Sequence, residues 1–365
     1  MSIDFLYLNE KDMIAAGVMD VAGCVEAMRE TMSLFGKKDF LLGGPKADEH
    51  GLQINFPATS DIEGFPLDDG PDRRFNAMPA YLGGKYHIAG QKFYGSNNHN
   101  LQKGLPRSIL MVTLNDVDTG APLAYMSANL LSAMRTGAMP AMAASYLARK
   151  DSKVLSLIGP GVINKCAFQC YMEVLPEIDT LKIRGSSVHS KSALNMKKFA
   201  EENYPQIKNI IICDSLEEAC RDSDVVSEAM SVTKQDMEEF KMDWFKKGAA
   251  VFSMGSFLVR DHESYLGTTM VADNYGMYEK YLKKARKDVK LEVIEEAVDY
   301  YGKALELKDT PELCIEVGNV YADNGWDSEA VEWGEKLIDK YPDEPKVYEF
   351  LLKQYIDSEQ YKECF

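Results

Sequence analysis

The chain has 365 residues, of which 45% are hydrophobic and 27% charged, as is typical of a globular protein with two or three domains. Its formal net charge of −16 argues against binding to nucleic acid or to an anionic membrane surface. The sequence shows no recognisable signal peptide and no apolar run long enough to span a membrane, so we expect a cytoplasmic protein without membrane contact.

The sequence offers little for a metal site. Its seven cysteines form no CxxC pair, and its five histidines show no HExxH spacing. Cys166 and Cys170 lie one helical turn apart, but no His or Cys partner is nearby in the sequence, which favours packing in a core over a metal pair. We therefore expect reduced thiols and no bound metal.

The first 130 residues predict an N-terminal α+β domain. A short strand over residues 5–8 precedes an N-cap sequence at Asn9 and an amphipathic helix over 24–35. Residues 59–75, rich in Asp, Gly and Pro, predict a loop. An antiparallel sheet is predicted from strands over 77–82, 86–94, 108–115 and 123–126 with a hairpin turn at 116–120, and a long helix over 127–148 follows.

Two basic residues occupy positions where a charge is unusual. Lys92 lies in an otherwise apolar strand, and Arg135 lies among small residues in the long helix. Charges in such settings are seldom buried without a partner. One interpretation is that both side chains point into a cleft and bind a carboxylate. The other is that each is paired, or extends to solvent, for structural reasons.

A glycine-containing segment then predicts a dinucleotide-binding turn. Residues 154–158 predict a buried parallel strand, Gly159 and Gly161 follow at once, and 162–175 has helical spacing. Gly159 permits a tight turn, and Gly161 lets a pyrophosphate approach the helix N-terminus. Asn164 replaces the third glycine, so we expect helix and strand to pack less closely here. The residues expected at the cofactor are Gly159, Pro160, Gly161, Val162 and Ile163.

Strands and helices alternate after this turn, which predicts a Rossmann-type, doubly wound parallel sheet. The further strands are expected at 180–183, 210–213, 224–226 and 249–253, with a helix over 190–202. We place the three domains at 1–130, 131–282 and 283–365.

The end of the second strand of this sheet bears on the choice of cofactor. An NAD site usually has an acid there for the ribose 2′-hydroxyl, and this chain has none. Arg184, Ser186, Ser187 and Lys191 would instead surround a 2′-phosphate. The sequence favours NADP(H), with NAD(H) as the alternative. The structural explanation is a solvated polar turn in which Ser190 caps the next helix.

The C-terminal third differs in composition, with many Glu, Tyr, Leu and Lys residues after the basic segment 283–287. Tyr321 and Tyr355 begin similar tripeptides 34 residues apart (355 − 321), and Pro345 is expected to open a helix. Helix pairs with a period near 34 resemble tetratricopeptide repeats, which offer surfaces to protein partners. The alternative is an ordinary helical bundle.

Several motifs together resemble the ornithine cyclodeaminase/mu-crystallin family over about residues 1–282. They comprise Met78-Pro-Ala-Tyr81, Gln91-Lys-Phe-Tyr94, Leu114-Asn-Asp-Val-Asp-Thr-Gly120, Ser132-Ala-Met-Arg-Thr-Gly-Ala138, Gly159-Pro-Gly161 and Ser253-Met-Gly-Ser256. Segments 70–81, 95–97 and 104–109 look most like a bacterial branch that takes its name from tyramine oxidase, as the B component of that enzyme.

The resemblance implies a homodimer that uses a nicotinamide cofactor on a small amino or imino acid. Family members are amino-acid dehydrogenases, ketimine reductases or cyclodeaminases. Lys92 and Arg135 match the catalytic pair that holds the substrate carboxylate, with Lys92 also assisting proton transfer. Lys46 falls where the family often has a carboxylate-binding arginine.

Two substrate-site positions depart from the cyclodeaminase pattern. Ser256 stands where cyclodeaminases carry an aspartate, and Asn76 stands where they carry a glutamate. A dehydrogenase or imine reductase needs only a carboxylate clamp and a proton donor, so the departures favour these activities over ornithine cyclisation. The alternative hypothesis is an NADPH-binding, non-catalytic scaffold whose helical repeats bind a protein partner.

Overall fold

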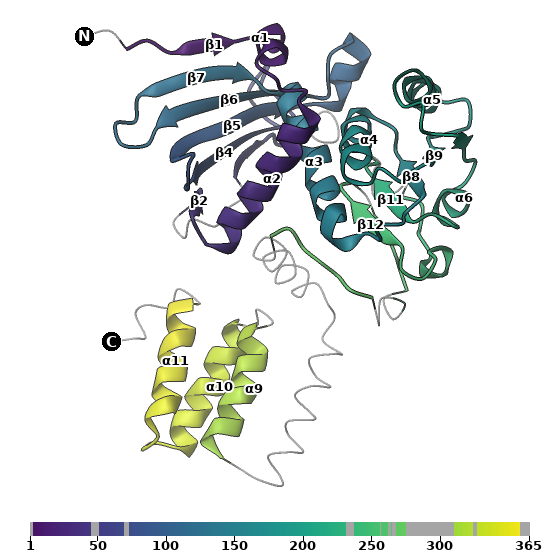
Figure 1. The fold of residues 1–365 in the computed structure, drawn as a ribbon. Coiled ribbons are helices and arrows are strands. Elements are labelled where there is room, and N and C mark those ends of the chain that lie inside the picture. Colours follow the sequence, from purple (N-terminus) through teal and green to yellow (C-terminus); the bar gives the residue numbers. More distant parts are fainter. Residues whose placement is uncertain are drawn as a thin grey trace. The chain divides into compact units, whose positions relative to one another are not determined.

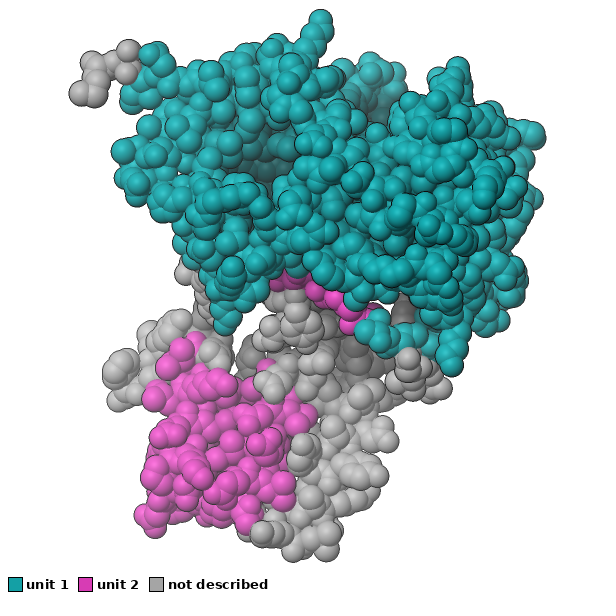
Figure 2. Space-filling view, in the orientation of Figure 1, with its two compact units in different colours: residues 1–269 teal, residues 270–365 magenta. Residues whose placement is uncertain are grey.

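The computed structural model describes most of the chain as two compact units, Met1–Thr269 and Met270–Phe365 (Figure 2). No helix in the described ranges is long and apolar enough to cross a membrane. The described residues are 3–44, 51–68, 73–230, 237–255, 257–261, 264, 268–274, 310–323 and 327–357.

A seven-stranded sheet forms the N-terminal part of the first unit (Figure 1). Its order is β1-β7-β6-β5-β4-β2, and β3 also pairs with β4. β1 runs parallel to β7, and the other pairs are antiparallel. The strands are β1 Leu6–Leu8, β2 Phe40–Leu42, β3 Leu52–Asn55, β4 Arg74–Leu82, β5 Ile88–Ser96, β6 Ser108–Asp116 and β7 Pro122–Ser127.

The predicted antiparallel strands and hairpin are present, but the loop expected over 59–75 ends early. β4 begins at Arg74, which pairs with Asn55 of β3 and with Ser96 of β5. Pairing on both sides holds these polar residues in an extended conformation despite the turn-prone composition before them.

Three helices belong to this part of the unit: α1 Glu10–Ala15, α2 Val21–Gly36 and α3 Asn129–Leu147. Asn9 caps α1 through a reciprocal pair of hydrogen bonds with Asp12, as its N-cap sequence predicted. α2 and α3 pack on each other, and α3 runs from the antiparallel sheet toward the second sheet (Figure 1).

The second sheet has five parallel strands in the order β10-β9-β8-β11-β12, so the predicted parallel sheet is confirmed. Its central strand, β8, precedes the glycine turn. The elements are β8 Val154–Ile158, α4 Val162–Val174, β9 Thr180–Arg184, α5 Lys191–Asn203, β10 Asn209–Ile212, α6 Leu216–Cys220, β11 Val225–Glu228 and β12 Ala250–Ser253. Short 3₁₀ helices cover Asn98–Lys103 and Met242–Trp244.

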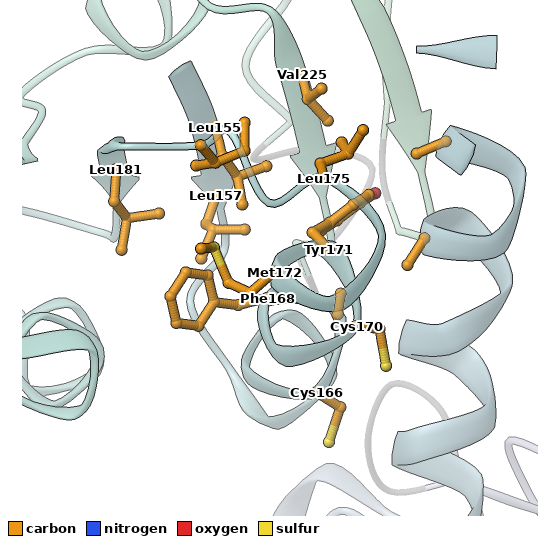
Figure 3. Packing of buried hydrophobic residues seen from close by; sticks show 14 of the residues in the cluster. Leu155, Leu157, Cys166, Phe168, Cys170, Tyr171, Met172, Leu175, Leu181 and Val225 are labelled. Atoms are coloured by element: carbon orange, nitrogen blue, oxygen red, sulfur yellow. The ribbon is translucent and has the colours of Figure 1, made fainter. Parts of the chain in front are cut away.

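The main core lies where α4 packs on β8 (Figure 3). Phe168 and Tyr171 of α4 are fully buried with Leu155 and Leu157 of β8. Cys166 and Cys170 belong to the same core. Burial raises the pKa of Cys166 to about 11 and that of Cys170 to about 12, which keeps both as thiols at neutral pH.

The backbones of α3 and α4 meet without side chains between them. A Cβ added at Gly137 of α3 would lie 2.4 Å from the amide nitrogen of Ala167 in α4. This approach explains why small residues dominate α3, and it fixes Arg135 relative to the glycine turn.

The second unit contains α9 Pro311–Asp323, α10 Asp327–Lys340 and α11 Pro345–Asp357. α11 begins at Pro345, as predicted. A Cβ at Gly318 of α9 would lie 2.3 Å from the ring of Phe350, so glycine at this position lets α11 pack closely.

Candidate functional site

The turn after β8 requires glycine at its first position. Gly159 has a φ of 76°, and a Cβ there would lie 2.8 Å from the carbonyl oxygen of Ala229. The Gly159 amide donates to the carbonyl oxygen of Arg184 at 2.9 Å, which joins the turn to the end of β9.

Gly161 has a different reason to be glycine. Its φ of −84° suits any residue, and a Cβ there would meet no atom within 4 Å. It is the N-cap of α4, and among the described residues no side chain caps this helix. The N-terminus of α4 therefore offers amide groups to a ligand, and the missing side chain leaves room for a pyrophosphate. Pro160 is buried here, Ile163 is half-buried and Val162 is exposed.

Asn164 corrects the expectation that the missing third glycine loosens this turn. The residue is fully buried, and its Nδ2 donates to the carbonyl oxygens of Ile158, Gly159 and Ser227 at 2.8–3.2 Å. Its Oδ1 accepts from the Ser227 hydroxyl at 2.7 Å. Asn164 thus binds the ends of β8 and β11 together, and its hydrogen bonds compensate for the wider spacing that a side chain imposes.

The end of β9 carries the residues predicted to select the cofactor. The Arg184 guanidinium turns back toward the carbonyl oxygen of Gly185 and forms an ion pair with Glu238, at 3.3 Å. Ser190 caps α5 by accepting from the Ala193 amide at 3.4 Å. Of the residues expected around a 2′-phosphate, Ser186, Ser187 and Lys191 are exposed.

Lys92 and Arg135 come close enough to interact. Lys92 lies on β5 opposite Met78 and Val112, with its ammonium 5.2 Å from the Tyr94 ring centre. Burial, and then the charge of Arg135, lower the pKa of Lys92 to about 8. Among the described residues no carboxylate forms an ion pair with Lys92.

Asn76 faces the same side of the sheet as Lys92, and two neighbouring residues escaped the sequence analysis. Asn76 is 2% exposed, and its Nδ2 donates to the Tyr94 hydroxyl at 3.2 Å. Nη2 of Arg74 donates to the same hydroxyl at 3.4 Å. Tyr94 follows Lys92 by two positions and Arg74 precedes Asn76 by two, a spacing that identifies one face of a strand once its strands are known.

A buried acid, Glu228, also escaped notice. It ends β11 and is fully buried. Its carboxylate accepts from the amides of Met230 and Gly255 at 2.6 and 3.2 Å, and from the Ser253 hydroxyl at 2.9 Å. Glu228 thus holds the loop after β12, and the available sequence signal was an acid ending an apolar strand. The expected site residues Lys46 and Ser256 lie outside the described residues.

Comparison with known proteins gives one family. The sequence profile of the ornithine cyclodeaminase/mu-crystallin family matches residues 18–321. The chain is 28% identical to N-((2S)-2-amino-2-carboxyethyl)-L-glutamate dehydrogenase of Staphylococcus aureus, over 75% of this chain and 76% of that protein. It is 33% identical to alanine dehydrogenase of Archaeoglobus fulgidus, over 49% of this chain and 52% of that protein, so this match spans about half of the relative's length.

Solved structures agree with this assignment. An archaeal alanine dehydrogenase dimer with bound NAD has a TM-score of 0.55 and 26% identity, covering 68% of this chain and 66% of that one. Δ1-pyrroline-2-carboxylate reductase of Thermococcus litoralis, in complex with NADH and L-proline, has a TM-score of 0.55 and 27% identity, covering 69% of each chain. The glycine turn, the two-sheet fold and the profile match lead to one conclusion: this chain belongs to the ornithine cyclodeaminase/mu-crystallin family.

Proposed function

We propose that the protein is an NAD(P)-dependent oxidoreductase that acts on a small amino or imino acid. The observation that carries this proposal is the pair of cations, Lys92 and Arg135, on the helix-covered face of the antiparallel sheet. Two like charges held close together destabilise each other, and a substrate carboxylate between them removes that cost. The relatives named as dehydrogenases and reductases support the same chemistry.

Lys92 is suited to move a proton as well as to bind. General acids and bases work best when their pKa lies near the working pH. With its pKa lowered to about 8, Lys92 populates both the ammonium and the amine near neutrality. We assign it the proton that an imine nitrogen gains on reduction, and we assign Arg135 to the carboxylate.

The glycine turn would hold the nicotinamide dinucleotide, which supplies or accepts the hydride when bound. Gly161 and the amides at the start of α4 would contact its pyrophosphate. Arg184, Ser186, Ser187 and Lys191 would contact a 2′-phosphate, and for this reason we favour NADP(H) over NAD(H).

Asn76 favours reduction or dehydrogenation over cyclisation. The residue stands in the substrate region as a neutral amide, already hydrogen-bonded to Tyr94. An amide cannot take a proton from a second amino group as a carboxylate can. A dehydrogenase or an imine reductase has no such requirement.

The opposite face of the antiparallel sheet supports a homodimer. It carries exposed apolar residues on adjacent strands, among them Leu52 (67% exposed), Ile54 (60%) and Phe75 (40%). Leu41 and Tyr7 extend this face on β2 and β1. A continuous apolar sheet face is a typical protein contact surface, and a second copy of the chain is the partner we propose.

For the second unit we propose a partner-binding role of the helical-repeat kind. α9 and α10 form a helix pair, and α11 packs on both. Tyr321 of α9 contacts the Trp333 ring, and Tyr355 of α11 donates to Glu335. A repeat array of this type presents its helices to a protein ligand.

We expect Arg135→Ala to lower kcat/KM sharply while leaving cofactor affinity nearly unchanged. Loss of a charge-assisted contact costs roughly 1.5–3 kcal/mol, or about tenfold to hundredfold in rate. The assay is NADPH and NADH oxidation with a panel of 2-oxo acids plus amines, and fluorescence titration gives cofactor affinity. Arg149→Ala, at an exposed arginine paired with Asp151, is the control. Unchanged turnover in Arg135→Ala would make this residue structural, whereas an inactive wild type that binds NADPH would favour the scaffold.

We expect kcat/KM in the reductive direction to fall as pH rises through about 8. Lys92 is protonated below its pKa, and above it the residue loses both the charge that binds carboxylate and the proton it donates. Lys92→Arg should abolish this limb, because arginine stays protonated. A pH profile of kcat/KM for both proteins tests this, and an alkaline limb that persists in the arginine variant would exclude Lys92 as its origin.

We expect NADPH to bind more tightly than NADH, and Arg184→Ala to weaken NADPH binding alone. Glu238→Gln should instead strengthen NADPH binding, because Glu238 is the acid that competes with a phosphate for Arg184. Fluorescence titration of both cofactors measures this. A wild-type preference for NADH, or equal losses for both cofactors, contradicts the assignment.

We expect Ile54→Lys to convert a dimer to a monomer. Ile54 pairs with Phe75 on the apolar face, and a lysine there places a charge and its symmetry mate in the contact. Light scattering after size-exclusion chromatography gives the mass. Ile62→Lys is the control, since Ile62 is as exposed, at 66%, but lies outside the sheet. Two dimeric variants would place the contact elsewhere.

A further inference from the structure

The Tyr94 hydroxyl has filled acceptor positions and a hydrogen with no acceptor. A tyrosine hydroxyl accepts at most two hydrogen bonds and donates one. Asn76 and Arg74 both donate to its oxygen, at 3.2 and 3.4 Å. Within the described part of the chain, no group accepts the hydroxyl hydrogen in return. Tyr94 is therefore a donor that awaits an acceptor from outside the protein chain.

The surroundings of Tyr94 favour an anionic acceptor. The Arg74 guanidinium lies 5.8 Å from the ring centre, and the Lys92 ammonium lies 5.2 Å from it. Burial would raise the pKa of Tyr94, but hydrogen bonds from Asn76 and Arg74, with the charges of Arg74 and Arg107, lower it. A hydroxyl with a lowered pKa donates a stronger hydrogen bond to an anion.

Asn76 shows that this corner of the site is built rather than incidental. It is 2% exposed, and its Oδ1 accepts no hydrogen bond from any residue that the structure describes. Burying an amide costs free energy unless its groups are paired. Here the amide is retained with its Nδ2 directed at Tyr94, which turns the hydroxyl hydrogen away from β4.

We propose that the substrate carries a second carboxylate, which accepts a hydrogen bond from Tyr94 and is neutralised by Arg74 and Arg107. This inference rests on the proposed function, in which Lys92 and Arg135 hold the first carboxylate. Tyr94 and Lys92 are two positions apart on one face of β5, which separates their Cα atoms by roughly 7 Å. The substrate class is thus an amino or imino acid with a short acidic side chain, and Tyr94 with Arg74 determines that specificity.

The first experiment measures binding without turnover. Glutarate and its monoamide, glutaramate, are titrated into the full-length protein by calorimetry. We expect glutarate to bind about tenfold to a hundredfold more tightly, the effect of one charge-assisted contact. Tyr94→Phe and Arg74→Gln should each remove most of this difference. Tyr81→Phe, whose hydroxyl pairs with His87 on the opposite face of β4, should keep it.

Equal affinities of the wild type for glutarate and glutaramate would overturn the inference. A preference that survives in both Tyr94→Phe and Arg74→Gln would overturn it as well, because the second carboxylate would then bind elsewhere. Either result stands whether or not the protein turns over a substrate.

The second experiment separates this inference from the proposed function. NAD(P)H oxidation is followed with ammonium and either 2-oxoglutarate or its amide, 2-oxoglutaramate. We expect the diacid to be preferred and Tyr94→Phe to lower kcat/KM for the diacid alone. Turnover of both compounds at equal rates refutes the second carboxylate and leaves the oxidoreductase proposal intact. Discrimination in binding with no turnover of any panel member refutes the oxidoreductase proposal and leaves the diacid site.

Discussion

The cofactor-binding end of the parallel sheet depends on one buried side chain, Asn164. A Rossmann turn usually gains its close packing from a third glycine, which brings helix and strand together. Here an amide occupies that space and forms four hydrogen bonds to the ends of β8 and β11. The carbonyl groups at these strand ends would otherwise lack partners in a buried place, so the asparagine supplies by hydrogen bonding what a glycine supplies by its absence of side chain.

The other sheet gathers positive charge instead. Lys92 and Arg135 come from different elements, and burial together with mutual repulsion lowers the pKa of the lysine. Such an arrangement lowers the stability of the unliganded protein, and proteins tolerate that cost mainly where a ligand removes it. The overall charge of −16 makes this local reversal more distinctive, because an anion is attracted here and repelled elsewhere.

The sequence predicted what local patterns encode. The strand over 154–158 was located to the residue, because a buried parallel strand followed by glycines is a local signal. Lys92 and Arg135 were noticed because a charge among apolar or small residues is also local. The start of β4 at Arg74 was missed, since it depends on pairing with a distant strand. The role of Tyr94 was missed for the same reason: its partners lie on the neighbouring strand, and only the register shows which residues face each other.

The contact between Gly137 and Ala167 has a mechanical consequence for the enzyme we propose. Where two helices touch through backbone atoms, neither can rotate on the other without a clash or a void. Arg135 lies two residues before Gly137, and the glycine turn lies at the start of the helix that carries Ala167. Substrate and cofactor sites are thus joined by a rigid strut rather than a hinge. Any motion that admits a substrate must come from the loops at the rim, while the distance between the two sites stays constant through the catalytic cycle.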